Sequence, residues 1–274
     1  MTHPTPPELA PAHLLATHDA HLRGRAELAD ATHLARIGPL WLGRYAEYGF
    51  VSYTDLDGVD GHTLDGLIEA AVRHFDDDPE VAEFEWKTRE HDAADHLSAR
   101  LQRAGFVPQA EEAVMIGTAA LLARPAPLPD GLTIRQVAPD DTAARHVHRV
   151  GEFHARVFDH PYSPSRDAEL LHRLTARPDV NAMWLIEEGD VIVSAGRLAV
   201  VEGTTFAGLW GGATDERWRH RGLYRALTSA RAYWGLNRGL EYLYAECTPF
   251  SRPILESAGL VQVTTTTPYL WTRA

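Results

Sequence analysis

The sequence of 274 residues lacks the features that mark several protein classes. It contains one cysteine, so no intramolecular disulfide can form, which fits a reducing compartment. No run of 18 apolar residues occurs, and the N-terminal MTHPTPP has neither the basic nor the apolar segment of a secretory signal. We therefore expect a soluble, cytoplasmic protein without a membrane partner.

Several catalytic signatures are also missing. The nucleotide P-loop GxxxxGK[ST] and the dinucleotide fingerprint GxGxxG do not occur. The hydrolase motif GxSxG and the metal motifs HExxH and CxxC are absent too. His146 and His148 are two positions apart on an expected helix and face different directions, which makes them poor metal ligands. We expect no metal site.

Positive charge is scarce and unevenly distributed. Residues 1–128 hold 21 acidic and 10 basic side chains, whereas residues 129–274 hold 17 and 16, which gives the net charge of −12. A polyanionic cofactor therefore suits the second half better than the first. Nucleic acid is not an expected partner, because it requires a broad basic face. An acidic N-terminal face would favour a cationic acceptor, such as a polyamine, an aminoglycoside or a basic peptide, although surface acidity alone usually serves solubility.

The most informative segment is RWRHRGLYRAL at residues 217–227. It follows an apolar, glycine-containing stretch that we interpret as a strand, and it leads into an amphipathic helix. Backbone N–H groups at a helix start have no intrahelical partners, and the helix dipole favours an anion there. Gly222 allows the backbone to approach a phosphate closely. The segment predicts a site for a phosphorylated cofactor.

This segment resembles motif A of the GNAT acyltransferases, Arg/Gln-x-x-Gly-x-Gly/Ala, which binds the pyrophosphate of acyl-CoA. Arg219, Gly222 and Tyr224 occupy its three defining positions. Tyr224 departs from the usual Gly or Ala, so its ring must point away from the pyrophosphate or line the pocket. The resemblance implies acetyl-CoA as cofactor, bound by Gly212, Ala213, Thr214, Arg219, His220, Arg221, Gly222, Leu223, Tyr224 and Ser251.

The flanking segments occur in the order that the family requires. We expect an opening strand at residues 132–137, a helix to about Phe158, a second helix over 165–176, and strands at 182–187, 191–200, 204–214 and 240–247. A short helix then ends at Gly259. The resemblance covers residues 131–274 and implies an α/β fold with a mixed, mostly antiparallel sheet flanked by helices.

The first half repeats part of this pattern. Gly105 and Gly259 each follow a strand and a short helix, 154 positions apart, which is about one GNAT domain. A helix at residues 64–75 would match the helix after Gly222, but its entry is acidic and has no arginine. An unrelated α/β domain is the alternative for this half. We predict a flexible N-terminus, a degenerate GNAT-like domain, a proline-rich linker and a catalytic GNAT domain, at residues 1–15, 16–122, 123–131 and 132–274.

Acyl transfer from a thioester to an amine requires a proton acceptor, an oxyanion site and a proton for the leaving thiolate. The resemblance implies that backbone N–H groups of the strand before the loop stabilise the oxyanion, and the paired glycines at 211 and 212 suit this role because they allow a bulge. The strand itself has no carboxylate. Glu246 on the next strand is therefore the first candidate for the base and Glu152 the second, and a chain of waters is a third possibility.

The general acid is a further open assignment. The family often has a tyrosine where this chain has Leu255, and the nearest substitutes are Tyr224 and Tyr269. We predict an N-acetyltransferase that acts on an amine, a small molecule rather than a protein, with acetyl-CoA in the C-terminal half. The alternative is a non-catalytic acyl-CoA-binding or regulatory protein, favoured by the missing strand carboxylate and by Leu255.

Overall fold

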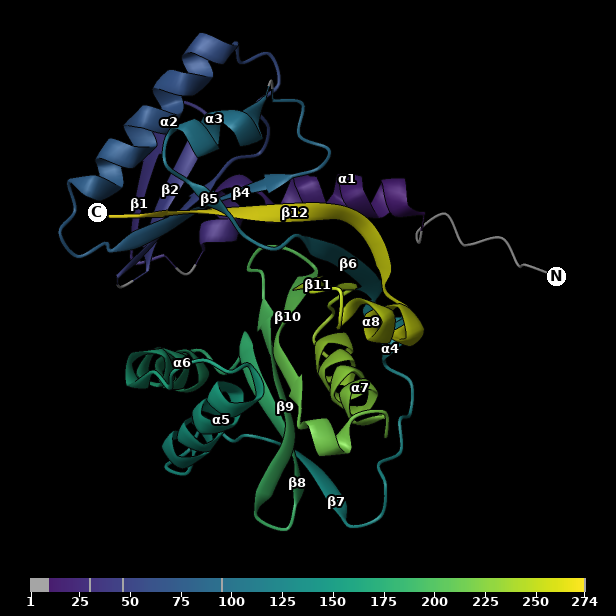
Figure 1. Ribbon diagram of the computed structural model, residues 1–274. Coiled ribbons are helices and arrows are strands. Elements are labelled where there is room, and N and C mark those ends of the chain that lie inside the picture. The colour runs from purple at the N-terminus through teal and green to yellow at the C-terminus, as the bar shows by residue number, and fades with distance from the viewer. Residues whose placement is uncertain (1–9, 30, 46, 95, 274) are drawn as a thin grey trace. The chain divides into compact units, whose positions relative to one another are not determined.

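A computed structural model describes residues 10–29, 31–45, 47–94 and 96–273, and these residues divide into two compact units (Figure 1). Unit 1 comprises the chain up to Met115 together with Glu246–Arg252 and Gln262–Ala274. Unit 2 comprises Ile116–Ala245 and Pro253–Val261. Both units have the predicted mixed α/β architecture.

Unit 1 is built on a mostly antiparallel sheet with strand order β1-β2-β3-β4-β12, and β5 pairs with β12. The one parallel pair among these strands, β3 and β4, is joined by α2. Apolar side chains of α2 pack on the sheet and form the core together with Phe84 and Trp86. The elements are α1 (Pro11–Leu22), η2 (Gly24–Leu28), β1 (His33–Ile37), β2 (Leu40–Tyr45), β3 (Tyr48–Ser52), α2 (Gly61–Asp76), β4 (Glu83–Arg89), α3 (Leu97–Arg103), β5 (Val107–Pro108) and β12 (Val261–Thr272).

Unit 2 has strand order β7-β8-β9-β10-β11, antiparallel except for β10 and β11, which are parallel and joined by α7. Helices α5 and α6 cover one face of this sheet and α7 covers the other (Figure 1). The elements are α4 (Ala119–Leu122), β7 (Leu132–Gln136), α5 (Ala143–Val157), α6 (Pro164–Ala176), β8 (Asn181–Glu188), β9 (Val191–Val200), β10 (Phe206–Thr214), η3 (Glu216–Trp218), α7 (Leu223–Leu236), β11 (Tyr242–Cys247) and α8 (Arg252–Ala258). The division between the units falls within β6 (Glu112–Thr118) and again within β11, whose last two residues, from Glu246, belong to unit 1.

Helices α5 and α6 of unit 2 were both predicted from local sequence patterns, and the structure contains both. Helix α5 buries Val147, Val150 and Phe153, which recur at intervals of three, on the face that packs against the sheet. The Asp140 carboxylate accepts the Thr142 N–H at 2.9 Å just before the helix. In α6, Ser163 accepts the N–H of the third helical residue, the usual N-cap arrangement.

The two units differ from the contiguous domains that the sequence suggested. Residues 262–274 were expected in the catalytic domain, but β12 pairs with β4 from Glu83 to Arg89, and these residues therefore belong to unit 1. Helix α1 begins at Pro11, within the segment for which a flexible N-terminus was expected. Residues 1–9 lie outside the described part of the chain.

Candidate functional site

Strand β10 contains a bulge at the paired glycines. Its register with β9 shifts between Trp210 and Ala213, and Gly211 adopts a φ of +56°. Among the described residues, β10 pairs with β11 at three positions, from Phe206 to Gly208. The carboxyl-terminal part of β10 therefore leaves its parallel neighbour, and Gly211 and Gly212 have no Cα partner on β9.

The start of α7 is an open helix N-terminus. Gly222 is the N-cap residue with a φ of +81°, and no side chain of the described residues accepts the N–H groups of the first turn. His220 just before it also has a positive φ of +62°. A β-carbon on Gly222 would meet only the tip of Arg225, at 3.8 Å, so the space above this backbone is open. Such a helix start can accept an anion.

Tyr224, the departure from the family motif, packs on the bulge. A β-carbon at Gly212 would lie 2.7 Å from the tyrosine ring, so glycine is needed for this contact. The Arg231 guanidinium lies 5.9 Å from the centre of the same ring. The ring therefore points towards β10.

The arginines of the loop differ in how far they are engaged. Arg217 is bound to Asp215, with its Nε and Nη2 both 3.1 Å from carboxylate oxygens. Arg221 stacks over Trp218, with 4.7 Å between the guanidinium and the ring centre. Arg219 makes a long contact of 3.4 Å to the Thr214 carbonyl and is exposed. Arg219 and Arg221 can therefore contribute charge to an anion, whereas Arg217 is held by its carboxylate.

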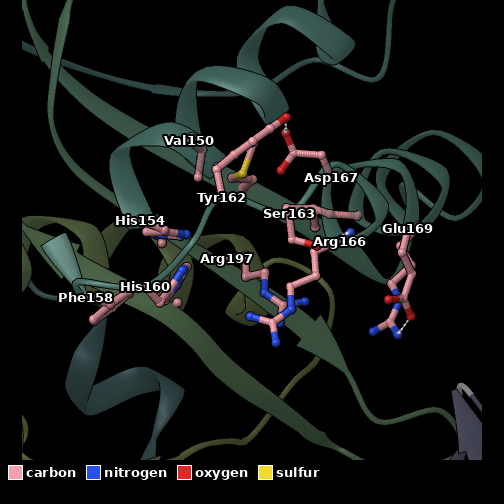
Figure 2. A pocket seen from close by; sticks show the side chains of 16 residues that line it. Val150, His154, Phe158, His160, Tyr162, Ser163, Arg166, Asp167, Glu169 and Arg197 are labelled. Atoms are coloured by element: carbon pink, nitrogen blue, oxygen red, sulfur yellow. Dashed lines mark hydrogen bonds and ion pairs between the residues drawn. The ribbon is translucent and has the colours of Figure 1, made fainter. Parts of the chain in front are cut away.

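A cavity of about 450 Å³ lies on the other face of the bulge, among α5, α6 and strands β8 to β10 (Figure 2). Gly211 forms part of its lining, and a β-carbon there would come within 3.1 Å of the His154 ring. Adjacent residues of the bulge thus face opposite ways, Gly211 towards the cavity and Gly212 towards Tyr224 on α7. A volume of this size suits a small molecule.

His154 is a site residue that the sequence reasoning missed. Its ring lines the cavity, and its Nε2 is buried without a hydrogen-bond partner among the described residues. Burial lowers the pKa of His154 to about 4, and the charge of Arg197 acts in the same direction, against an opposing contribution from the Gly211 backbone. The imidazole is therefore neutral at physiological pH. Its spacing from Val147 and Val150, which placed it on the inward face of α5, was the available signal.

Glu246, the first candidate for the base, is held in a buried ion pair. The Lys87 ammonium donates to its carboxylate at 2.5 Å, and Glu85 lies 3.5 Å from the same ammonium. Burial alone would raise the pKa of Glu246, but the charges of Lys87 and Arg89 outweigh it, and the pKa is lowered. A carboxylate stabilised in this way is a poor proton acceptor. This pair lies within unit 1.

The other predicted residues have varied surroundings. Glu152 is exposed on α5, 3.6 Å from His148, and does not line the cavity. The Tyr269 hydroxyl donates to Ser98 at 2.6 Å within the core of unit 1, so it acts there as a packing residue. Ser251 lies in the turn that precedes α8, and its N–H donates to the Thr248 carbonyl.

Two further predicted positions lie at the end of β10. The Ala213 carbonyl accepts the Ser194 hydroxyl at 2.7 Å, and the Thr214 hydroxyl lies 2.8 Å from that same hydroxyl. Leu223, the first residue of α7, is buried. Within the described residues there is no group of three or more His, Cys, Asp or Glu able to hold a metal ion, and no helix has the length and apolarity to cross a membrane.

Comparison with known proteins agrees with this geometry. The family model described as "Acetyltransferase (GNAT) family" matches residues 147–254, which include the cavity helices, the bulge and the α7 N-terminus. No curated protein sequence matches the chain significantly.

Solved structures with this fold extend over both units. A GCN5-related N-acetyltransferase from Kribbella flavida has a TM-score of 0.71 at 15% identity, covering 95% of this chain and 96% of its own. One from Sphaerobacter thermophilus has a TM-score of 0.59 at 18% identity, with 85% and 76% covered. A tandem GNAT protein of the clavulanic acid biosynthesis pathway has a TM-score of 0.56 at 13% identity, with 86% and 81% covered. At these identities the likeness concerns the fold.

Proposed function

Because the chain carries a GNAT acetyltransferase domain, we propose that unit 2 binds acetyl-CoA at the α7 N-terminus and transfers the acetyl group to the amine of a small molecule. The amine would occupy the cavity that α5 and α6 form with the sheet. The observation that carries this proposal is the bulge in β10. Its Gly212 faces Tyr224 in the first turn of α7, and its Gly211 faces the cavity.

The residues of the loop fit a pyrophosphate. The N–H groups from His220 to Tyr224 would bind its oxygens, since the left-handed Gly222 leaves this backbone uncovered. Arg219 and Arg221 would add positive charge near it. Bound acetyl-CoA supplies the activated acyl group. The N–H groups of Gly211 and Gly212, which face no Cα partner on β9, would stabilise the negative charge that develops on the thioester oxygen.

His154 would accept the proton that the amine loses. Its Nε2 has no other partner in the described part of the chain, and the ring is neutral at the pH of a cell because its pKa is about 4. A weak base of this kind acts best late, when attack on the carbonyl has made the amine nitrogen acidic. This role replaces the carboxylate that β10 lacks. The leaving thiolate needs no strong acid, because it is a tolerable leaving group.

The direct test is release of free CoA from acetyl-CoA in the presence of a panel of small primary amines. We expect a thiol signal that depends on the amine, and a matching acetylated product by mass spectrometry. CoA binding without release for any amine would instead identify a non-catalytic acyl-CoA-binding protein.

The role of His154 is tested by His154→Gln, with His172→Gln as the matched control. His172 is an exposed histidine on α6 that does not line the cavity. We expect His154→Gln to lower kcat by roughly 10²–10⁴-fold, the usual contribution of a general base. The Kd for CoA should remain unchanged, and His172→Gln should match the wild type. A His154→Gln enzyme with wild-type kcat would remove this residue from the mechanism.

A further inference from the structure

The acidic side chains that line the cavity already have partners. Asp167 accepts the Tyr162 hydroxyl at 2.6 Å and lies 3.7 Å from His148. Glu169 forms an ion pair with Arg173 one turn further along α6. These two carboxylates are therefore not available as the main attraction for a cationic ligand.

Arg166 and Arg197 also line this cavity and bring positive charge to it from a helix and from the sheet. Arg166 is in the first turn of α6 and is exposed, and none of the described residues forms an ion pair with it. Arg197 comes from β9, the central strand beneath the cavity. Figure 2 shows these side chains extending towards one another from the helix and from the sheet. Two guanidinium groups presented in this way suit a carboxylate or a phosphate, which accept paired N–H donors.

The surroundings of His154 indicate the same electrostatic character. Besides burial, the charges of Arg197 and of His160 both disfavour protonation of this imidazole and lower its pKa. The charge of Arg197 therefore acts on the imidazole beside which we place the amine. A diamine or polyamine would meet repulsion there, whereas an amine that also carries an anion would compensate it.

We propose that the acceptor is a small amine that also carries an anionic group, a carboxylate or a phosphate-type group, bound by Arg166 and Arg197. This inference rests on the proposed function, because it assigns the acceptor class of the same cavity. The positive surroundings have a second effect, since they favour the neutral, nucleophilic form of the bound amine. This acceptor class differs from the cationic one that an acidic N-terminal face would favour, because it is argued from the charges that line the cavity.

The test uses four acceptors with one three-carbon skeleton and measures binding to the CoA-saturated protein by NMR titration. They are 3-aminopropanoate, 3-aminopropylphosphonate, 3-aminopropan-1-ol and 1,3-diaminopropane. We expect at least one anionic compound to bind about tenfold or more tightly than the alcohol and the diamine, and the better anion identifies the group. Equal or tighter binding of the diamine or the alcohol would overturn the proposal.

Arginine variants show whether the preference belongs to this site. Arg166→Gln should remove most of the anion preference without affecting folding, because this side chain is exposed. Arg197→Gln should do the same, and Arg177→Gln is the control, since Arg177 lies at the end of α6, pairs with Glu202 and does not line the cavity. An anion preference that persists in Arg166→Gln overturns the assignment.

Binding is measured without turnover, so the two proposals can fail separately. Anion-selective binding with no CoA release for any amine would contradict the acetyltransferase proposal and leave the anion site standing. Efficient acetylation of the diamine without anion preference would support the acetyltransferase and overturn the acceptor class.

Discussion

Helices α2 and α7 occupy corresponding positions in the two units, yet their N-termini differ. Each joins a pair of parallel strands, β3 and β4 in unit 1 and β10 and β11 in unit 2. Asp60 caps α2, accepting the Thr63 N–H at 2.8 Å and its hydroxyl at 3.1 Å. Gly222 begins α7 without a side-chain cap. The same strand–helix–strand arrangement can thus fill its anion site with its own carboxylate or leave it open for a ligand.

Buried titratable groups of the two units also differ in whether they have partners. In unit 1, Lys87, the only lysine of the sequence, is enclosed by Glu85 and Glu246, and Arg89 donates to Glu27 at 2.6 Å. These charges compensate one another. In unit 2, by contrast, the ring of His154 lines a cavity, and its buried Nε2 has no hydrogen-bond partner among the described residues. The buried Lys87 of unit 1 is thus neutralised by carboxylates of its own unit, whereas the buried Nε2 of His154 is the atom to which we assign a role towards the substrate.

The largest effect is expected from breaking the ion pair of unit 1. Lys87→Met leaves the Glu246 charge buried, and loss of one member of such a pair costs about 3–5 kcal/mol of unfolding free energy. Chemical denaturation would measure it. Glu246→Gln should cost less, because Glu85 still contacts the ammonium. If Glu246→Gln instead abolishes CoA release in a protein of normal stability, Glu246 belongs to the catalytic site after all.

The same pair has a defined pH dependence. The pKa of Glu246 is lowered on folding, so its stabilising contribution is complete above the ordinary glutamate pKa of about 4.3 and is lost as the pH falls through the lower folded value. The wild type should therefore lose stability in acid more steeply than Glu246→Gln. Equal acid slopes in denaturation curves would contradict the pairing.

The next largest effect should distinguish the N-terminus of α7 from that of α2. Gly222→Val places a β-branched residue at a φ of +81° and covers the proposed phosphate site, so we expect CoA affinity to fall by about 100-fold or more, roughly 2.7 kcal/mol. Gly58→Val is the matched control, because Gly58 has a φ of +73° in the loop before α2 and a β-carbon there would meet no atom within 4 Å. It should lose stability but bind CoA normally. Calorimetry would distinguish these outcomes, and unchanged CoA affinity in folded Gly222→Val would refute the assignment.

The smallest effect concerns the cap of α2. Asp60→Ala should lower the unfolding free energy by about 1 kcal/mol, the usual loss for an N-cap residue. The stoichiometry should remain one CoA per chain, because the loop before α2 still has no arginine. Titration of both proteins would measure this. Two equivalent sites in the wild type would end the interpretation of unit 1 as a degenerate half.

The local features of this protein could be predicted from its sequence. The glycine before α7, the arginines around it and the apolar spacing of the helix all lie within residues 217–234, and a helix start depends on such neighbours. The repeated strand and helix pattern likewise identified α2 as the counterpart of α7. Strand alternation could not identify the partner of Glu246, because Lys87 lies 159 positions away.

Only the tertiary structure decided which distant residues meet. Pairing of β12 with β4 assigns the last strand to unit 1, and the ion pair with Lys87 gives Glu246 a structural environment. Packing of α5 on the bulge brings His154 to Gly211. The physical reason is that helix entry and amphipathicity are short-range properties of the chain, whereas burial, ion pairing and cavity formation depend on side chains that folding brings together from remote positions.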